Sequence, residues 1–145
     1  MQAKIKKDWY GRLKSVEELH DDTRLWISEI DFIIDEIRFL KNLLSSYYIQ
    51  LLDAGLNKKT ARLVKAISDK TTTANLFSKL VKNHNNKLSN LIASKSVTSN
   101  IHYLDTHQKL EVEIKIFLKR YKKSKRQIFE ILDKLMTAKG VKKLL

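Results

Sequence analysis

Apolar residues recur at alternating steps of three and four along most of the chain, which is the spacing of one face of an α-helix. A broad stripe of this kind runs from Trp9 to Leu52. A second, more polar stripe runs from Leu63 to Leu91, and a third from Tyr103 to Leu135. The spacing therefore predicts three long helices followed by a short basic tail, over residues 9–54, 58–95, 100–138 and 139–145.

Residues that favour turns and helix ends lie between the stripes. Gly55 suits the left-handed position that follows a helix, and Asn57 suits the cap of the next one. The segment 94–100, rich in Ser and Asn, predicts the second turn. Thr71-Thr72-Thr73 lowers helix propensity inside the second stripe, so a break in the second helix is an alternative.

Three segments of similar length joined by short turns have to fold back on one another to bury their stripes. The pattern thus predicts an all-α fold, an antiparallel up-down-up bundle that forms a single domain over residues 1–145. The stripes are broad, and aromatics such as Phe39, Tyr47, Tyr48 and Phe129 exceed what a narrow three-helix core requires. We therefore expect the bundle to contact a protein partner or a second copy, as in a dimer.

The composition agrees with long helices and excludes several classes of site. The chain has no proline, three glycines and no cysteine, so helix breakers are rare and disulfides and thiolate metal sites are excluded. No apolar run approaches the length of a membrane span, and the basic N-terminus has no apolar run behind it. We expect a cytoplasmic protein without a membrane segment. It has no nucleophile elbow and no phosphate-binding glycine loop, which favours a non-enzymatic function.

Two sets of residues resemble a family of small, uncharacterised bacterial helical-bundle proteins. The resemblance covers the first and third predicted helices, about half of the chain, and implies a helical bundle with no established activity. The residues that carry it are Glu18-Leu19-His20, Leu25-Trp26, Glu29, Phe32, Asp35-Glu36-Ile37, Leu40 and Leu43-Leu44, and then His102, His107, Leu110, Phe117, Tyr121, Lys125 and Phe129.

Histidines are the candidate chemistry of the chain. Folding around Gly55 and around Ser99 predicts that His20 and His107 lie at the same level of the bundle. Thr23, in the middle of the first stripe, is polar at nearly that level. By the same geometry His84 should occupy a core position about 12 Å away, level with Ser28 and Glu29. His102 is expected to face outward.

Two interpretations of this histidine level remain open. His20, His107 and Glu17, which lies one helical turn from His20, form a possible divalent-metal site, because bundles hold metals with inward imidazole and carboxylate ligands. Alternatively the histidines form a hydrogen-bonded polar layer that fixes helix register, or lie at a hydrated end of the bundle.

Charge is distributed unevenly. The formal net charge is +13, with eight of the 16 acids between Glu17 and Glu36 and a basic run from Lys115 to Arg126. The predicted register places Glu36 level with Lys122 or Lys123. A basic pole at one end of the bundle makes nonspecific nucleic-acid binding a further alternative. Its residues are Lys58, Lys59, Arg62, Lys65, Lys134, Lys139, Lys142 and Lys143.

Overall fold

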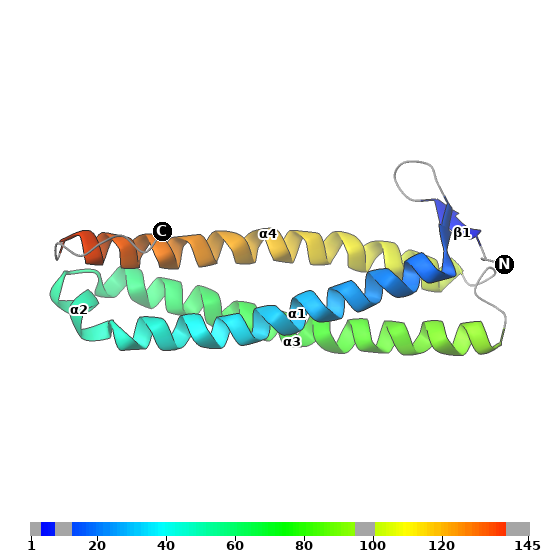
Figure 1. Cartoon of the computed structure of the whole chain (residues 1–145), viewed down its shortest axis with the longest axis horizontal. Helices are drawn as coiled ribbons and strands as arrows, with labels where there is room; N and C mark the ends of the chain where they lie inside the picture. Colours follow the sequence, from blue (N-terminus) through cyan, green and yellow to red (C-terminus); the bar gives the residue numbers. More distant parts are fainter. Residues whose placement is uncertain (1–3, 8–12, 95–100, 139–145) are drawn as a thin grey trace. The chain divides into compact units, whose positions relative to one another are not determined.

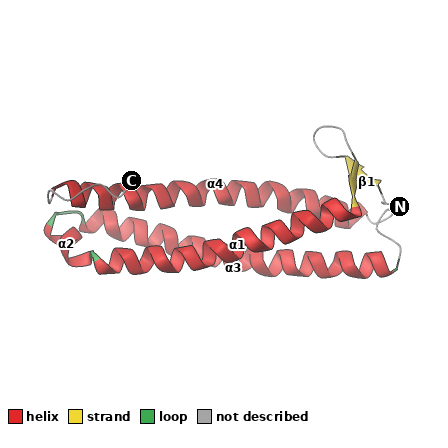
Figure 2. Ribbon diagram, in the orientation of Figure 1, coloured by secondary structure: helices red, strands yellow, loops and turns green. Residues whose placement is uncertain are grey.

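The computed structural model describes residues 4–7, 13–94 and 101–138. Apart from one short β-hairpin and the turns between helices, these residues are helical, so the all-α prediction is confirmed (Figures 1 and 2). The hairpin consists of β1 and β2, and the helices are α1, α2, α3 and α4. Their bounds in chain order are Lys4–Lys7, Leu13–Ser15, Val16–Ser46, Tyr48–Asp53, Asn57–Ala93 and Ile101–Ala138.

The first helix begins later than the apolar spacing predicted. Residues 13–15 pair with 4–7 as antiparallel strands, and α1 begins only at Val16. Ser15 and Glu18 form a capping box at this point: the Glu18 amide donates to Ser15 Oγ at 3.2 Å, and the Ser15 amide donates to Glu18 Oε1 at 3.2 Å. The prediction of a helix from Trp9 onward was therefore wrong for residues 13–15, because the capping box makes α1 begin at Val16. Trp9 itself lies outside the described residues.

The first helix also ends earlier than predicted. α1 stops at Ser46, Tyr47 is a turn, and α2 is a separate short helix. Gly55 follows α2 with a φ of 75°, as predicted. The amide of Leu56 donates to the carbonyl of Leu51 at 2.9 Å, and that of Gly55 to the carbonyl of Leu52 at 3.0 Å. This is the bond pattern of a Schellman motif, which satisfies carbonyls left open at a helix end.

The second long helix, α3, is continuous through the threonine run. The alternative of a break near Thr71–Thr73 was wrong, because two of these hydroxyls bond within the helix: Thr71 Oγ1 donates to the carbonyl of Ile67 at 3.5 Å, and Thr73 Oγ1 to that of Asp69 at 3.2 Å. Asn57 is the first residue of α3 and not the cap before it. The third helix runs over 101–138, close to prediction, and the basic tail at 139–145 lies outside the described residues.

The chain divides into two compact units. Unit 1 comprises residues 1–31 and 75–116, and unit 2 comprises residues 32–74 and 117–145. Each unit therefore contains a segment of α1, of α3 and of α4. In unit 1, Leu19, Leu88, Tyr103 and Leu104 form a buried apolar cluster. In unit 2 the fully buried aliphatic side chains include Ile37, Leu40, Leu44, Leu51, Ile67, Ile128, Ile131, Leu132 and Leu135.

A polar connection joins two helices within unit 2. Glu36 of α1 accepts hydrogen bonds from the Tyr121 hydroxyl and, at 2.9 Å, from Lys125 Nζ, both on α4. These partners lie within a few residues of the predicted level at Lys122 or Lys123. Among the described residues, no helix is long and apolar enough to cross a membrane.

Candidate functional site: a buried histidine pair in unit 1

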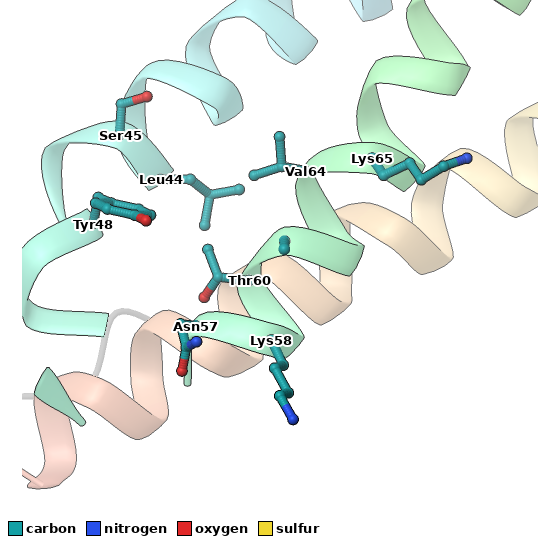
Figure 3. Close-up of a pocket in the computed structure, with 9 residues that line it drawn as sticks. Leu44, Ser45, Tyr48, Asn57, Lys58, Thr60, Val64 and Lys65 are labelled. Atoms are coloured by element: carbon teal, nitrogen blue, oxygen red, sulfur yellow. The ribbon is translucent and has the colours of Figure 1, made fainter. Parts of the chain in front are cut away.

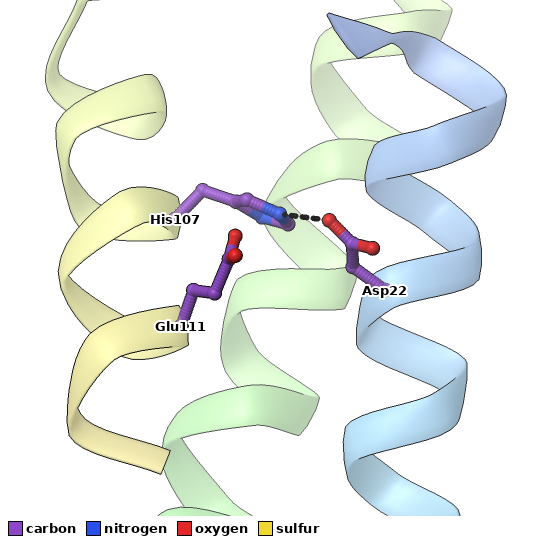
Figure 4. A group of neighbouring side chains, drawn as sticks. All are labelled: Asp22, His107 and Glu111. Atoms are coloured by element: carbon purple, nitrogen blue, oxygen red, sulfur yellow. Dashed lines mark hydrogen bonds and ion pairs between the residues drawn. The ribbon is translucent and has the colours of Figure 1, made fainter. Parts of the chain in front are cut away.

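Two histidines meet inside unit 1. His107 of α4 and His84 of α3 are each only 3% exposed, and His84 Nε2 lies 2.8 Å from His107 Nδ1. The second nitrogen of His107, Nε2, lies 2.9 Å from Oδ2 of Asp22 on α1 (Figure 4). A single chain of hydrogen bonds thus connects all three long helices.

A lysine joins this chain to a second carboxylate. Lys14 of β2 donates from Nζ to Asp22 Oδ2 at 2.5 Å and to Glu111 Oε2 at 3.2 Å. Glu111 lies one turn after His107 on α4 and also accepts from Lys115 at 3.1 Å. Lys14 is therefore a shared cation between two partly buried carboxylates, which anchors the hairpin to α1 and α4.

Aromatic rings enclose the histidine pair. The Tyr103 ring stacks on the His84 ring with centroids 4.1 Å apart and an interplanar angle of 0°. Trp26 packs against His107 with centroids 4.8 Å apart. Each imidazole is only 3% exposed, so the hydrogen bond between the two rings gains strength from the low local dielectric.

Burial and ion pairing act in opposite directions on the charged members of the cluster. Burial alone would raise the pKa of Asp22, but the hydrogen bonds from His107 and Lys14 hold it below its ordinary value. Burial alone would lower the pKa of Lys14, and its two carboxylate partners raise it. Burial alone would also raise the pKa of Glu111, but the hydrogen bonds from Lys115 and Lys14 hold it below its ordinary value. All three groups are therefore charged at neutral pH.

Two aromatic members of the cluster, His84 and Tyr103, are held in their neutral forms. Burial, followed by the neighbouring His107 and Lys87, lowers the pKa of His84 to about 3. Burial and the charge of Asp22 raise the pKa of Tyr103 above its ordinary value. Unlike the ion pairs beside it, His84 is a neutral imidazole at neutral pH.

The carboxylate determines how hydrogens are arranged along the chain. An ionised carboxylate only accepts, so His107 Nε2 donates its hydrogen to Asp22. The next hydrogen bond of the chain joins His107 Nδ1 to His84 Nε2 at 2.8 Å.

Of the three residues predicted as a site, the structure brings only His107 into this cluster. His20 is half-buried and Glu17 is exposed. The carbonyl of His20 accepts from Thr23 Oγ1 at 2.8 Å, and Thr23, fully buried as its place in the stripe predicted, also bonds Asn85 Oδ1 at 3.0 Å. The predicted metal set of His20, His107 and Glu17 stays a prediction. His102 is exposed, as expected.

The predicted position of His84, about 12 Å from the others, was wrong. The expectation placed the second turn at Ser99 and so set His107 opposite residue 91. Because α3 ends at Ala93 and α4 begins at Ile101, the midpoint between the helix ends lies nearer residue 97. That shift alone moves the partner of His107 by about four residues, roughly 6 Å, toward His84.

Sequence reasoning also missed Asp22, Glu111 and Lys14. One signal was available: His107 and Glu111 are four residues apart and share a helix face. Asp22 lies one residue from the buried Thr23, at the edge of the apolar stripe. Nothing in the periodicity points to Lys14, which reaches the cluster from a strand that the pattern did not predict.

The cluster contains a possible set of metal ligands. It consists of a carboxylate oxygen of Asp22, a ring nitrogen of His107 and a carboxylate oxygen of Glu111 (Figure 4). These three atoms all lie within 4.8 Å of one another. Nitrogen and oxygen donors of this kind suit a divalent ion such as zinc or manganese. However, the ammonium of Lys14 already binds both carboxylates, so a metal ion would have to displace it.

Comparison with known proteins adds no further identification. No protein-family model matches the chain, and no curated protein or solved structure matches it.

Proposed function

We propose that this chain is a non-enzymatic, cytoplasmic helical-bundle protein, an antiparallel up-down-up bundle of three long helices that pairs with a second copy of itself. Two contacts support the antiparallel direction, one in each unit. In unit 1, Thr23 of α1 bonds Asn85 of α3. In unit 2, Leu44 of α1 lies beside Thr60 and Val64 of α3. Residues later in α1 are therefore next to residues earlier in α3.

The observation that carries self-association is a pair of exposed phenylalanines on α1 in unit 2. Phe32 is 62% exposed and Phe39 is 57% exposed. They are seven residues apart and so lie on one face of the helix. The neighbouring Ile33, Ile37 and Leu40 are buried and already form the core. Burying each phenylalanine in an interface would contribute about 1.5–3 kcal/mol.

An open apolar groove lies further along the same unit. It has a volume of about 770 Å³ and is formed by the end of α1, α2 and the start of α3 (Figure 3). Leu44 and Thr60 are buried at its base, whereas Tyr48 and Val64 are exposed, and Lys58 and Lys65 lie at its edge.

A two-fold pairing brings the phenylalanines and the groove together. If two copies of α1 pack antiparallel about Phe39, Phe39 meets its own symmetry mate and Phe32 of each copy lies level with Ser46 of the other. Ser46 adjoins the groove residues Leu44 and Ser45. Each copy then inserts Phe32 into the partner's groove, and the exposed Asp35 approaches the groove lysines. Such an interface is self-complementary, as a two-fold dimer requires.

The test is sedimentation equilibrium of the full chain and of Phe39→Glu. We expect the unchanged chain to be a dimer in the micromolar range. Phe39→Glu should be a monomer with unaltered helix content, because two carboxylates would then face each other at the two-fold axis. The matched control is Leu76→Glu, which changes a similarly exposed apolar residue (55% exposed) in unit 1. A monomeric unchanged chain, or an equal effect of Leu76→Glu, would refute the proposal.

A metal-binding bundle is the second candidate, supported by the grouping of His107 with Asp22 and Glu111. Elemental analysis of protein purified without a histidine tag, with thermal shifts in Zn, Fe or Mn, tests it. Binding that persists in His107→Gln would exclude both this set and the predicted set with His20 and Glu17.

Nonspecific nucleic-acid binding is a third candidate. It is supported by the exposure of five cations of the predicted basic pole; the other three, Lys139, Lys142 and Lys143, lie outside the described residues. A fluorescence titration should show a steep loss of affinity with salt, and no binding at low salt would exclude it. The exposed cations are Lys58, Lys59, Arg62, Lys65 and Lys134.

A further inference from the structure

Positive charge is unequal between the two units, although each contains segments of the same three helices. The described residues of unit 1 include ten Lys and Arg against nine Asp and Glu. Those of unit 2 include 14 Lys and Arg against six Asp and Glu, a formal net charge of +8. The excess positive charge of the described residues therefore lies almost entirely in unit 2.

Within unit 2 the cations are densest in one segment of α4, residues 119–126. Every exposed side chain of this segment is cationic. Its other residues are Tyr121 and Ser124, which are buried, and Lys125, which donates to Glu36 at 2.9 Å. Five exposed cations thus occupy about 10 Å of helix. They form what we call the α4 basic face: Lys119, Arg120, Lys122, Lys123 and Arg126.

The acids of unit 2 do not neutralise the α4 basic face. None of its five cations forms an ion pair with a described residue. Glu36, the acid of α1 nearest in level, is already bound by Tyr121 and Lys125. The next acid along α4 is Glu130, one turn after Arg126. Like charges three or four residues apart on a helix repel one another, so an anion that contacts several of these cations at once would stabilise the helix.

The kinds of side chain on the face indicate which polyanion fits it. Protein interfaces have an apolar and aromatic core from which charges are depleted, and a helix bound at a membrane surface inserts apolar side chains. The segment 119–126 exposes neither kind. A nucleic-acid duplex needs neither, because it carries about one negative charge per 1.7 Å of its axis. Over about 10 Å that is roughly six charges, which is close to the five cations of the face.

We propose that the α4 basic face binds the phosphate backbone of a nucleic-acid duplex, DNA or RNA, without reading its bases. Lysine contacts phosphate as a point charge, and the segment exposes no aromatic side chain that could stack on a base. This proposal goes beyond the third candidate function, which assigns nucleic-acid binding to the basic pole, and does not rest on it. The groove and phenylalanines of the proposed dimer include no residue of α4, so pairing leaves this face open.

Fluorescence anisotropy tests this proposal, with the full chain titrated into labelled DNA and RNA duplexes of about 20 base pairs at several salt concentrations. We expect the logarithm of the affinity to fall with the logarithm of the salt concentration with a slope of about −4. Lys119→Gln and Lys123→Gln together should weaken binding at least about tenfold and make the slope shallower by about two. An unchanged slope in this double variant would overturn the proposal.

Two further double variants that remove the same charge are the controls. Lys79→Gln with Lys82→Gln changes exposed lysines of α3 in unit 1, and Lys58→Gln with Lys59→Gln changes the basic pole. Both should leave the salt slope unchanged. A loss in the pole variant alone would overturn this proposal and leave the third candidate standing, whereas equal losses in all three variants would show an effect of net charge only and overturn it. No binding at low salt, or tighter binding to phosphatidylserine vesicles than to either duplex, would also overturn it.

Discussion

Units 1 and 2 are built from segments of the same three helices, but they bury different kinds of side chain. Among the described residues, 15 of the 25 buried apolar residues lie in unit 2 and ten in unit 1. Four of the six buried polar residues lie in unit 1, namely Ser15, Thr23, His84 and His107. Unit 2 is thus held mainly by apolar burial, and unit 1 by a smaller apolar core around a polar network.

This difference affects how strictly each unit defines its register. An apolar side chain that moves past its neighbours still finds apolar contact, so burial alone discriminates weakly between registers. Hydrogen bonds lose their geometry within about half an ångström, and the chain from His84 through His107 to Asp22 is satisfied in one register only. We infer that unit 1 specifies the alignment of the helices, while unit 2 contributes more of the stabilisation.

The largest expected effect comes from the core of unit 2. Leu40→Ala should lower the free energy of unfolding by about 3 kcal/mol, because the fully buried side chain leaves a cavity. Chemical denaturation followed by circular dichroism measures this change. The control is Leu76→Ala at an exposed position, expected within about 0.5 kcal/mol of the unchanged chain. A loss below about 1 kcal/mol for Leu40→Ala would contradict the assignment of stability to unit 2.

A somewhat smaller effect is expected in the polar network of unit 1. Asp22→Ala should cost about 2 kcal/mol, because it removes the acceptor of His107 Nε2 and one of the two carboxylates around Lys14. The matched control is Asp21→Ala at the adjacent exposed position, where little change is expected. If unit 1 defines register, Asp22→Ala should also broaden the NMR signals of unit 1 more than those of unit 2. Sharp, unshifted signals would argue against that role.

The smallest effect is the response to mild acid. The pKa of His84 is lowered to about 3 in the folded protein, whereas an unfolded histidine titrates near 6.5. Between these values the unfolded chain binds more protons, so stability decreases as the pH falls from about 6.5 toward 3. The lowered pKa values of Asp22 and Glu111 add a further loss below about pH 4.

Denaturation at pH 7 and pH 5 measures the histidine contribution separately from the carboxylates. We expect the unchanged chain to lose on the order of 1 kcal/mol over this interval. His84→Phe should lose less, whereas His20→Gln, outside the network, should behave like the unchanged chain. The same pH dependence in all three proteins would assign the acid response to other groups.

The sequence predicted the parts of the site that depend on one helix at a time. Periodicity placed His107 and Thr23 in the core and His102 at the surface, because helix geometry relates residues of one helix to within a few degrees per step. The residues of α1 and α4 that lie beside each other were predicted nearly as well. His107 was expected beside His20 and meets Asp22, and Glu36 was expected beside Lys122 or Lys123 and meets Tyr121 and Lys125.

Contacts that depend on where a turn lies were not predicted. His84 lies about two helical turns from its expected level, and the helix ends at Ala93 and Ile101, which differ from the assumed turn centre, account for about one of these turns. The start of α1 was misplaced because apolar spacing continues through a strand, and only the capping bonds between Ser15 and Glu18 mark the boundary. Lys14 could not be placed at the site from the sequence, because it lies on this strand, which the apolar spacing did not predict.

The sequence by itself therefore determined the all-α fold, the approximate helix lengths, the left-handed turn at Gly55 and the inward orientation of His107. Tertiary structure alone decided that His84 and His107 share a hydrogen bond, that Asp22 orients them and that Lys14 joins the carboxylates. The reason is one of scale. Local periodicity fixes which face a residue occupies, but a hydrogen bond requires about half an ångström of precision between helices, and one residue of turn length moves a helix by about 1.5 Å.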